Sequence, residues 1–191
     1  MAANVKVMQR PELTVWEKTY IPQILAGLKI IDTDTHLSEP ADLWTSRAPA
    51  RYRDLVPRQL EVGGRMRWII GADVDLGGTG ASSVIDPNGD KIYGVSWLKL
   101  PWNEVHAASS QIPARLEMMD RHGIHAQIMY PNLAGFGNTR FLQSPDEALR
   151  LITTEIYNDA LAEFQAATNQ RVYGMALIPW WNLEAAEAEI R

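Results

Sequence analysis

The sequence contains no cysteine and only three phenylalanines among its 191 residues. Without thiolates, disulfide bridges and cysteine-ligated metal sites are excluded, so any metal would need imidazole or oxygen ligands. Positive charge is also scarce, because 18 Lys and Arg residues are outnumbered by 23 Asp and Glu residues, for a formal net charge of -5. This balance argues against a nucleic-acid or anionic-membrane surface, which would need clustered basic residues. A small-molecule substrate remains the expected partner.

Long apolar runs are missing as well. The run over residues 175–181 is far shorter than the roughly 20 residues that a membrane-spanning helix needs. Residues 1–20 mix charged with apolar side chains and lack the continuous apolar segment of a signal peptide. What the sequence does contain is an apolar content of 46% with seven tryptophans, which is enough for one globular core. We therefore expect a cytoplasmic protein that contacts neither membranes nor nucleic acid.

The second half of the chain alternates between helix and strand patterns. Residues 113–122 have apolar side chains at helical spacing and are followed by Gly123, which is typical of a helix C-terminus. The apolar stretches 124–130 and 172–178 are short and end at prolines, which predicts two buried strands.

Between these two strands lies a strong helix-start signal. Ser144 is the expected N-cap, Pro145 fits the first turn and Glu147 completes a capping box. The apolar spacing then predicts a helix that continues to about Thr168. A last helix, rich in alanine and glutamate, is predicted over residues 183–191.

The first half of the chain is organised differently. An N-terminal arm is expected over residues 1–27, and the apolar run that follows predicts a first strand ending near His36. Residues 45–112 lack helical periodicity and contain several glycine-rich turn signals. We expect an insertion rich in β-hairpins there, with strands over 65–70 and 84–93.

Strand and helix segments alternate in the pattern of βαβ units, which form a parallel sheet through right-handed crossovers. Such a sheet is either doubly wound or closed into a barrel, so the fold class is α/β. A barrel of eight units needs about 250 residues. With three βα units and a large insertion, residues 1–191 are expected to form the N-terminal part of one barrel domain.

Three polar residues at the end of the first strand, Asp32, Asp34 and His36, are spaced two apart. Because side chains alternate along a strand, all three would point to one face. A carboxylate and an imidazole at alternate positions can reach one metal ion about 2.0 to 2.2 Å away. Spacing alone also allows a capped strand end, in which these side chains bind amides of the next turn. Asp32 lies deeper and is expected to be a hydrogen-bonding group rather than a ligand.

Several short motifs follow one another in a recognisable order between about residue 29 and residue 191. They are Asp32-Thr33-Asp34-Thr35-His36, Glu39-Pro40 with Asp42-Leu43-Trp44, Arg115 to Asp120 with Gly123-Ile124, Tyr130-Pro131, Tyr157 to Phe164 and Gly174 to Pro179. This order resembles the amidohydrolase-related family that includes aminocarboxymuconate semialdehyde decarboxylase and related aromatic acid decarboxylases.

The resemblance implies a metal-dependent hydrolase-type TIM (β/α)8 barrel, whose first strand supplies metal ligands. In this chain those ligands are Asp34 and His36, with Asp34 in place of a first histidine. The implied cofactor is a divalent metal, Zn²⁺ first and Mn²⁺ as the alternative, because a carboxylate also suits harder ions. The family's remaining ligands and its metal-bound aspartate come from later strands, so no catalytic residue is assigned within this chain.

The carboxyl ends of the second and third strands supply candidate pocket walls, because barrel enzymes gather substrate contacts at that end. Tyr130, Asn132 and Trp180 are the expected substrate-binding residues, and tandem tryptophans suit a flat aromatic or unsaturated acid. An equally weighted alternative is that Trp180 and Trp181 cover the barrel rim or a subunit contact. His106, in the insertion, is expected to be a solvated loop residue, with a place at a substrate mouth as the alternative.

The sequence thus favours a metal-dependent amidohydrolase-type enzyme that is incomplete in this chain. It would be a hydrolase or a non-oxidative decarboxylase acting on a small carboxylated or cyclic substrate. The alternative is a non-catalytic or assembly subunit, since three βα units leave a sheet edge unpaired. Its partner would be a second copy, in a homo-oligomer, or a complementing chain.

Overall fold

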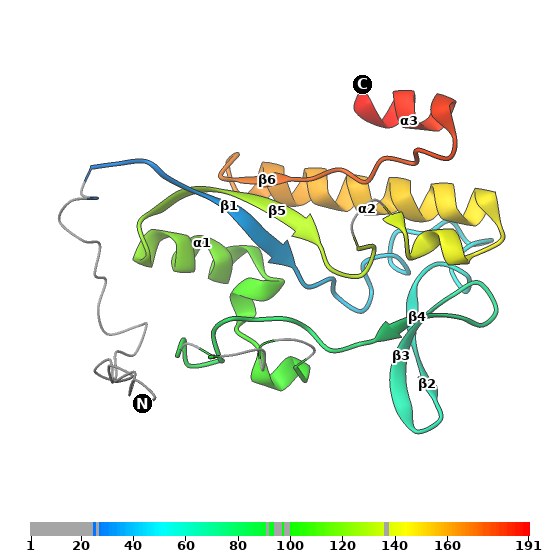
Figure 1. Cartoon of the computed structure of the whole chain (residues 1–191), viewed down its shortest axis with the longest axis horizontal. Coiled ribbons are helices and arrows are strands. Elements are labelled where there is room, and N and C mark those ends of the chain that lie inside the picture. Colours follow the sequence, from blue (N-terminus) through cyan, green and yellow to red (C-terminus); the bar gives the residue numbers. More distant parts are fainter. Residues whose placement is uncertain (1–24, 26, 91, 94–96, 98–99, 136–137) are drawn as a thin grey trace, which may run out of the picture.

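The computed structural model describes residues 25, 27–90, 92–93, 97, 100–135 and 138–191, so the arm expected over residues 1–27 lies almost wholly outside the described residues. Six elements build the main layer, in chain order β1 (Ile30–Leu37), α1 (Ile112–Arg121), β5 (Ile124–Pro131), α2 (Glu147–Ala167), β6 (Val172–Gly174) and α3 (Leu183–Ile190). The three strands form a parallel sheet in the order β1, β5, β6, with α1 and α2 beside it (Figure 1). An α/β chain with a parallel sheet is thereby confirmed.

The helices follow the sequence patterns closely, with one correction. His122 is the C-cap of α1, and Gly123 continues with a φ of 67°, a conformation that glycine adopts without strain. The N-cap of α2 is Asp146, whose side chain accepts a hydrogen bond from the Leu149 N–H at 3.1 Å. The prediction of Ser144 as N-cap was wrong, because Asp146 caps equally well and Ser144 instead ends a short 3-10 helix. None of the helices in the described part of the chain combines the length and apolar character needed to cross a bilayer.

The third strand of the main sheet, β6, is shorter than predicted. Strand pairing stops at Gly174, although the Met175 N–H still donates to the Met129 carbonyl at 2.9 Å. Further along, Asn158 of α2 binds both backbone groups of Leu177, accepting from its N–H at 2.8 Å and donating to its carbonyl at 2.9 Å. A helix side chain therefore takes the place of the strand partner that would extend β6.

The C-terminal part of α2 also binds the outer edge of β6. The Val172 N–H donates to Thr168 Oγ1 at 3.2 Å, and the Gly174 N–H donates to Gln165 Oε1 at 3.3 Å. These two N–H groups point away from β5, because the hydrogen bonds to β5 come from the carbonyl of Arg171 and the N–H of Met175, which flank β6 and alternate with Val172 and Gly174. Gln165 of α2 and its C-cap Thr168 thus satisfy donors that would otherwise be open to a further strand.

The insertion contains a second, antiparallel sheet of three strands, in the order β2 (Arg58–Val62), β3 (Arg65–Ile70) and β4 (Val74–Gly78). The bounds of β3 are those predicted. Over 84–93 the backbone pairs as a short hairpin, because the Asp86 N–H donates to the Asp90 carbonyl and the Ile92 N–H to the Val84 carbonyl, both at 2.9 Å. The Asp86 carboxylate accepts from the N–H groups of Asn88 and Asp90 and builds the turn, and the described residues on either side form no extended strand. The small sheet lies near the carboxyl ends of β1 and β5 (Figure 1).

Trp44 is fully buried at the centre of the hydrophobic core. Its ring packs edge to face against Trp68 and Phe141, with ring centroids 5.6 and 6.0 Å away, and stacks on Tyr157 at 6.3 Å. Its Nε1 donates to the Thr153 carbonyl at 3.0 Å, which satisfies the one polar atom of the side chain. The cluster joins the segment after β1 to the small sheet and to α2.

The two faces of the main sheet differ in burial. Met129 and Val172 are fully buried on the face that the helices cover. Ile31 pairs with Ala126, and Tyr173 pairs with Ile128 two residues further along β5, so both lie on the opposite face. There Ile31 is 56% and Tyr173 46% exposed, so two large apolar side chains of this face are open to solvent, although Ala126 between them in the sheet is buried.

Candidate metal centre

A register shift in β1 decides where the predicted ligands point. Ile30 pairs with Ile124 and Ile31 with Ala126, so β5 has one residue more at that point, and the register returns further along, because Asp32 pairs with Gln127 and His36 with Tyr130, where β1 has one residue more. The extra residue breaks the alternation and puts Asp32 on the helix-covered face beside Gln127, whereas His36 lies on the open face beside Tyr130. The prediction that Asp32, Asp34 and His36 share one face is therefore wrong for Asp32.

Asp34 and His36 come together at the end of β1. Asp34 Oδ1 lies 3.6 Å from His36 Nε2, and the two side chains are 83% and 37% exposed. Two ligand atoms about 2.0 to 2.2 Å from a tetrahedral ion would be about 3.3 to 3.6 Å apart, so this spacing suits a shared ion. His36 Nδ1 lies 3.3 Å from the Pro131 carbonyl oxygen. Because a carbonyl only accepts, this contact favours a proton on Nδ1. The Nε2 atom, which is the ring nitrogen near Asp34, then keeps a lone pair that can bind a metal ion.

The pair is a partial ligand set. Among the residues that the structure describes, no group of three or more His, Cys, Asp or Glu side chains is arranged to hold a metal ion. A catalytic zinc site has three protein ligands and a structural one has four. Asp34 and His36 therefore suit a divalent ion chemically but need further ligands from water, substrate or other protein groups.

A cavity of about 730 Å³ opens beside the pair, which is a volume suited to a small organic ligand. Its walls come from β1, the insertion, α1 and β5. Its polar lining includes Asp32, Asp34, His36, His106, Arg115, Gln127 and Asn132, so Asp32 borders the same space as the pair although it lies on the other face of β1. The candidate metal ligands thus border a space large enough for a substrate.

A buried charged network supports β1 from the helix side. Arg115 of α1 is only 2% exposed, and burial lowers its pKa to about 10 while the charge of Asp32 opposes that shift. Arg115 therefore stays protonated near neutral pH. Gln127 connects the two charged groups, since its Oε1 accepts from Arg115 at 3.3 Å and its Nε2 donates to Asp32 at 2.9 Å. Asp32 is thus a hydrogen-bonding group, as the sequence predicted.

Two further histidines line the same cavity. His106 is the N-cap of a 3-10 helix, η3 (Ala107–Ser109), and its Nδ1 accepts from the Ala108 N–H at 3.1 Å. Burial lowers the pKa of both His106 and His122 below the usual value, which favours neutral rings near pH 7. His106 is half-buried and lines the cavity, which agrees with the alternative of a residue at a substrate mouth rather than with the expected solvated loop residue.

The predicted substrate-binding residues do not lie together. Asn132 lines the cavity, and the ring of Tyr130 lies 5.9 Å from that of His36 at an angle of 38°. Trp180 is 55% exposed, packs edge to face on Trp181 with centroids 6.0 Å apart, and is not among the residues that line the cavity. A role in substrate binding stays a prediction for all three residues.

A buried acid lies just after the same strand end. Glu39 is 5% exposed, and its Oε1 accepts from the N–H groups of Asn132 and Leu133, both at 2.8 Å. Burial raises the pKa of Glu39 to about 7, although these two N–H groups and the charge of Arg140 oppose the rise. Glu39 therefore holds in place the loop that carries Asn132.

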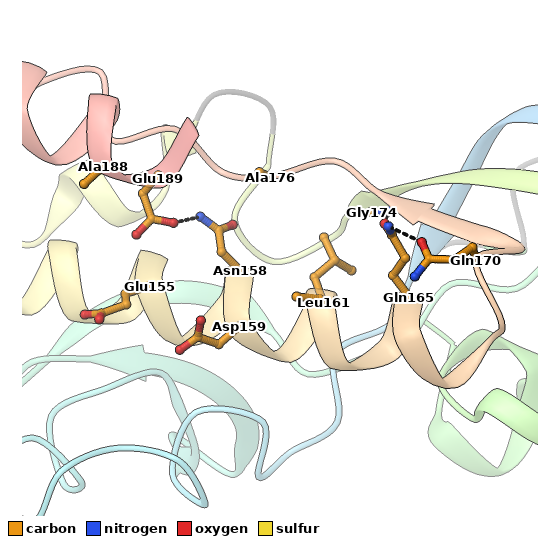
Figure 2. Close-up of a pocket in the computed structure, with 11 residues that line it drawn as sticks. Glu155, Asn158, Asp159, Leu161, Gln165, Gln170, Gly174, Ala176, Ala188 and Glu189 are labelled. Carbon is orange, nitrogen blue, oxygen red and sulfur yellow. Dashed lines mark hydrogen bonds between the residues drawn. The ribbon is translucent and has the colours of Figure 1, made fainter. Parts of the chain in front are cut away.

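A second cavity, of about 610 Å³, lies between α2 and the segment from β6 to α3 (Figure 2). Glu155, Asp159 and Glu189 line it, and burial together with the other two carboxylates raises the pKa of Glu155. Figure 2 shows Asn158 hydrogen bonded to Glu189 across the gap. Because Asn158 also binds the backbone of Leu177, the polar contacts here fix the chain after β6 onto α2.

Sequence reasoning missed Arg115, Gln127 and Glu39. A signal for Arg115 existed, because it lies four residues before Met119 and therefore on the buried stripe of α1. A charged side chain on such a stripe needs buried partners. Gln127 likewise interrupts an apolar strand, but no local pattern indicates that the two side chains meet.

Comparison with known proteins supports the fold. No family model matches the chain, and no curated protein matches it. Among solved structures it is similar to an amidohydrolase from Mycobacterium avium subsp. paratuberculosis K-10, with a TM-score of 0.60 and 20% identity. The match covers 84% of this chain and 45% of the other, so the chain spans less than half the length of that protein. At this identity the likeness shows an amidohydrolase-like fold.

Proposed function

We propose that the chain is the metal-binding part of an amidohydrolase-type enzyme, incomplete by itself and belonging to a (β/α)8 barrel. The observation that carries the proposal is the 3.6 Å approach of Asp34 Oδ1 and His36 Nε2 at the carboxyl end of a parallel strand. Barrel enzymes place their catalytic groups at this end of the strands. The amidohydrolase-like fold supports the same reading.

In this proposal Asp34 and His36 hold a divalent metal, Zn²⁺ first and Mn²⁺ as the alternative. When bound, such an ion lowers the pKa of a coordinated water and polarises a carbonyl group. The protein's own contribution is orientation, because the Pro131 carbonyl fixes the His36 ring through Nδ1.

The substrate is a small carboxylated or cyclic molecule, and the reaction is a hydrolysis or a non-oxidative decarboxylation. A cavity of about 730 Å³ bordered by the pair supports a ligand of that size. Asn132 and Tyr130 would contact it from the end of β5, and Trp180 would do so from the segment after β6. The group that completes the chemistry lies outside the described residues.

Zinc binding by the purified chain tests the proposal. Equilibrium dialysis with metal analysis should show zinc retained by the wild type, and His36→Ala should weaken binding at least tenfold because it removes one of the two proposed ligands. Asp34→Asn should weaken binding in the same direction.

His125→Ala is the matched control, because His125 is exposed at the start of β5, at the opposite end of the strand. It should bind zinc as the wild type does. Equal zinc binding by the wild type and by His36→Ala would sink the proposed metal centre.

The second candidate function is an assembly subunit that completes its barrel with another chain. The observation that favours it is the open apolar face, where Ile31 and Tyr173 are 56% and 46% exposed. The occupant would be a second copy in a homo-oligomer or a complementing chain. Sedimentation velocity should then show an oligomer that Tyr173→Glu dissociates, whereas a wild-type monomer at all concentrations would rule out the homo-oligomer.

A further inference from the structure

Arg115 donates hydrogen bonds to two successive residues of β1 through the two terminal nitrogens of its guanidinium group. Its Nη1 donates to Thr35 Oγ1 at 3.1 Å, and its Nη2 donates to the His36 carbonyl at 2.8 Å. These residues come directly after the register shift that begins at Asp32. A planar fork can fix both acceptors at once, which a point-like ammonium cannot do.

The same two nitrogens bind two further elements. Nη1 also donates to Gln127 Oε1 of β5, and Nη2 donates to the Ser109 carbonyl of η3, both at 3.3 Å. Only Nε, which is buried, has no hydrogen-bond partner among the described residues. Arg115 thus ties β1 to β5 and to the insertion through one side chain of α1.

We propose that Arg115 is a positioning residue for the Asp34–His36 pair, and that it holds β1, beyond the irregular pairing at Ile31 and Asp32, in the register that pairs His36 with Tyr130 and puts His36 on the open face. The inference rests on the proposed metal centre. Side chains of a strand change face when pairing slips by one residue, so His36 would turn toward the helices if the pairing of Asp32 with Gln127 continued along β1 without the shift before Thr35. Arg115 acts through the β1 backbone, because its contact with His36 is to the carbonyl oxygen.

Arg115→Lys is the sharpest test, because lysine keeps the charge beside Asp32 but loses the fork. Arg121→Lys is the matched control on the same helix, since Arg121 forms an exposed ion pair with Glu117. Two measurements are made on each protein: the ring signals of His36 in the NMR spectrum of the metal-free chain, and zinc affinity by competition with a chelating dye.

In Arg115→Lys the His36 ring signals should shift or broaden while those of His125 stay in place. Zinc affinity should fall about 10- to 100-fold, the usual effect of removing a group that orients a ligand. Arg121→Lys should leave both readouts unchanged. If Arg115→Lys fails to fold, Thr35→Val removes one acceptor of the fork without a change in shape and should act in the same direction.

Each outcome decides the matter. A folded Arg115→Lys protein with wild-type His36 signals and zinc affinity within about twofold would overturn the inference, even if it unfolds more easily. Shifted His36 signals in a chain whose wild type binds no zinc would refute the metal centre and leave the positioning role of Arg115 standing.

Discussion

Replacing Glu39 by glutamine should change how the stability of the fold depends on pH. Burial raises the pKa of Glu39 from 4.5 to about 7. A carboxyl group whose pKa is higher in the folded protein stabilises the fold in its protonated form, so its contribution is complete below about pH 4.5 and is lost as the pH rises through about 7. Glutamine keeps an oxygen that can accept from Asn132 and Leu133 but cannot ionise.

The size of the effect follows from the two pKa values. One pKa unit corresponds to about 1.4 kcal/mol, so ionising Glu39 costs the folded state about 3 kcal/mol relative to the unfolded chain. The ionisable groups around Glu39 keep the same charge between about pH 4.5 and about pH 8. The Arg140 cation lowers the pKa of Glu39, and Tyr157, whose own pKa is raised by burial and by Glu39, stays neutral.

Urea unfolding followed by tryptophan fluorescence measures the effect at several pH values and constant ionic strength. The unfolding free energy of Glu39→Gln minus that of the wild type should grow by about 3 kcal/mol between about pH 4.5 and about pH 8. Glu163→Gln is the control, because Glu163 pairs with Arg47 at the surface and its removal should cost under about 1 kcal/mol. A difference for Glu39→Gln that does not vary with pH would refute the reasoning.

Two further substitutions test the packing. Trp44→Phe removes the hydrogen bond to the Thr153 carbonyl and part of a buried ring, so urea unfolding should show a free energy of unfolding lower by about 2 kcal/mol. A decrease below about 0.5 kcal/mol would contradict the central role of Trp44 in the core. Gly174→Ala should lower stability by about 1 to 3 kcal/mol, because a Cβ there would overlap the Leu161 side chain, whereas Gly78→Ala, with open space around it, should cost less than about 1 kcal/mol. Equal melting temperatures for the two glycine variants would contradict the predicted overlap.

The elements after residue 112 could be read from the sequence because local signals decide them. Gly123 ends α1, the apolar runs give the strands, and the helical spacing gives α2 and α3. The short extent of β6 could not be read, because it depends on Asn158 reaching the backbone of Leu177 from another element.

The candidate site was predictable only as far as its residue types. Asp34 and His36 lie close together as alternation along a strand predicts, with 3.6 Å between Oδ1 and Nε2, and their role as metal ligands stays a prediction. The same rule failed for Asp32, because the register shift depends on contacts between β1, β5 and α1 that no period along β1 reveals. The buried state of Glu39 was hidden for the same reason, since its partners lie at residues 132 and 133.

The hydrogen bonds between the edge of β6 and the side chains of Gln165 and Thr168 affect how readily copies of the protein aggregate through that edge. An incoming strand would find the amides of Val172 and Gly174 already occupied and would first have to dislodge Thr168 and Gln165. These two hydrogen bonds therefore slow edge-to-edge pairing of β6 with strands of other molecules and so hinder the formation of fibrils. A tethered strand, held nearby at high effective concentration, would still be able to displace them.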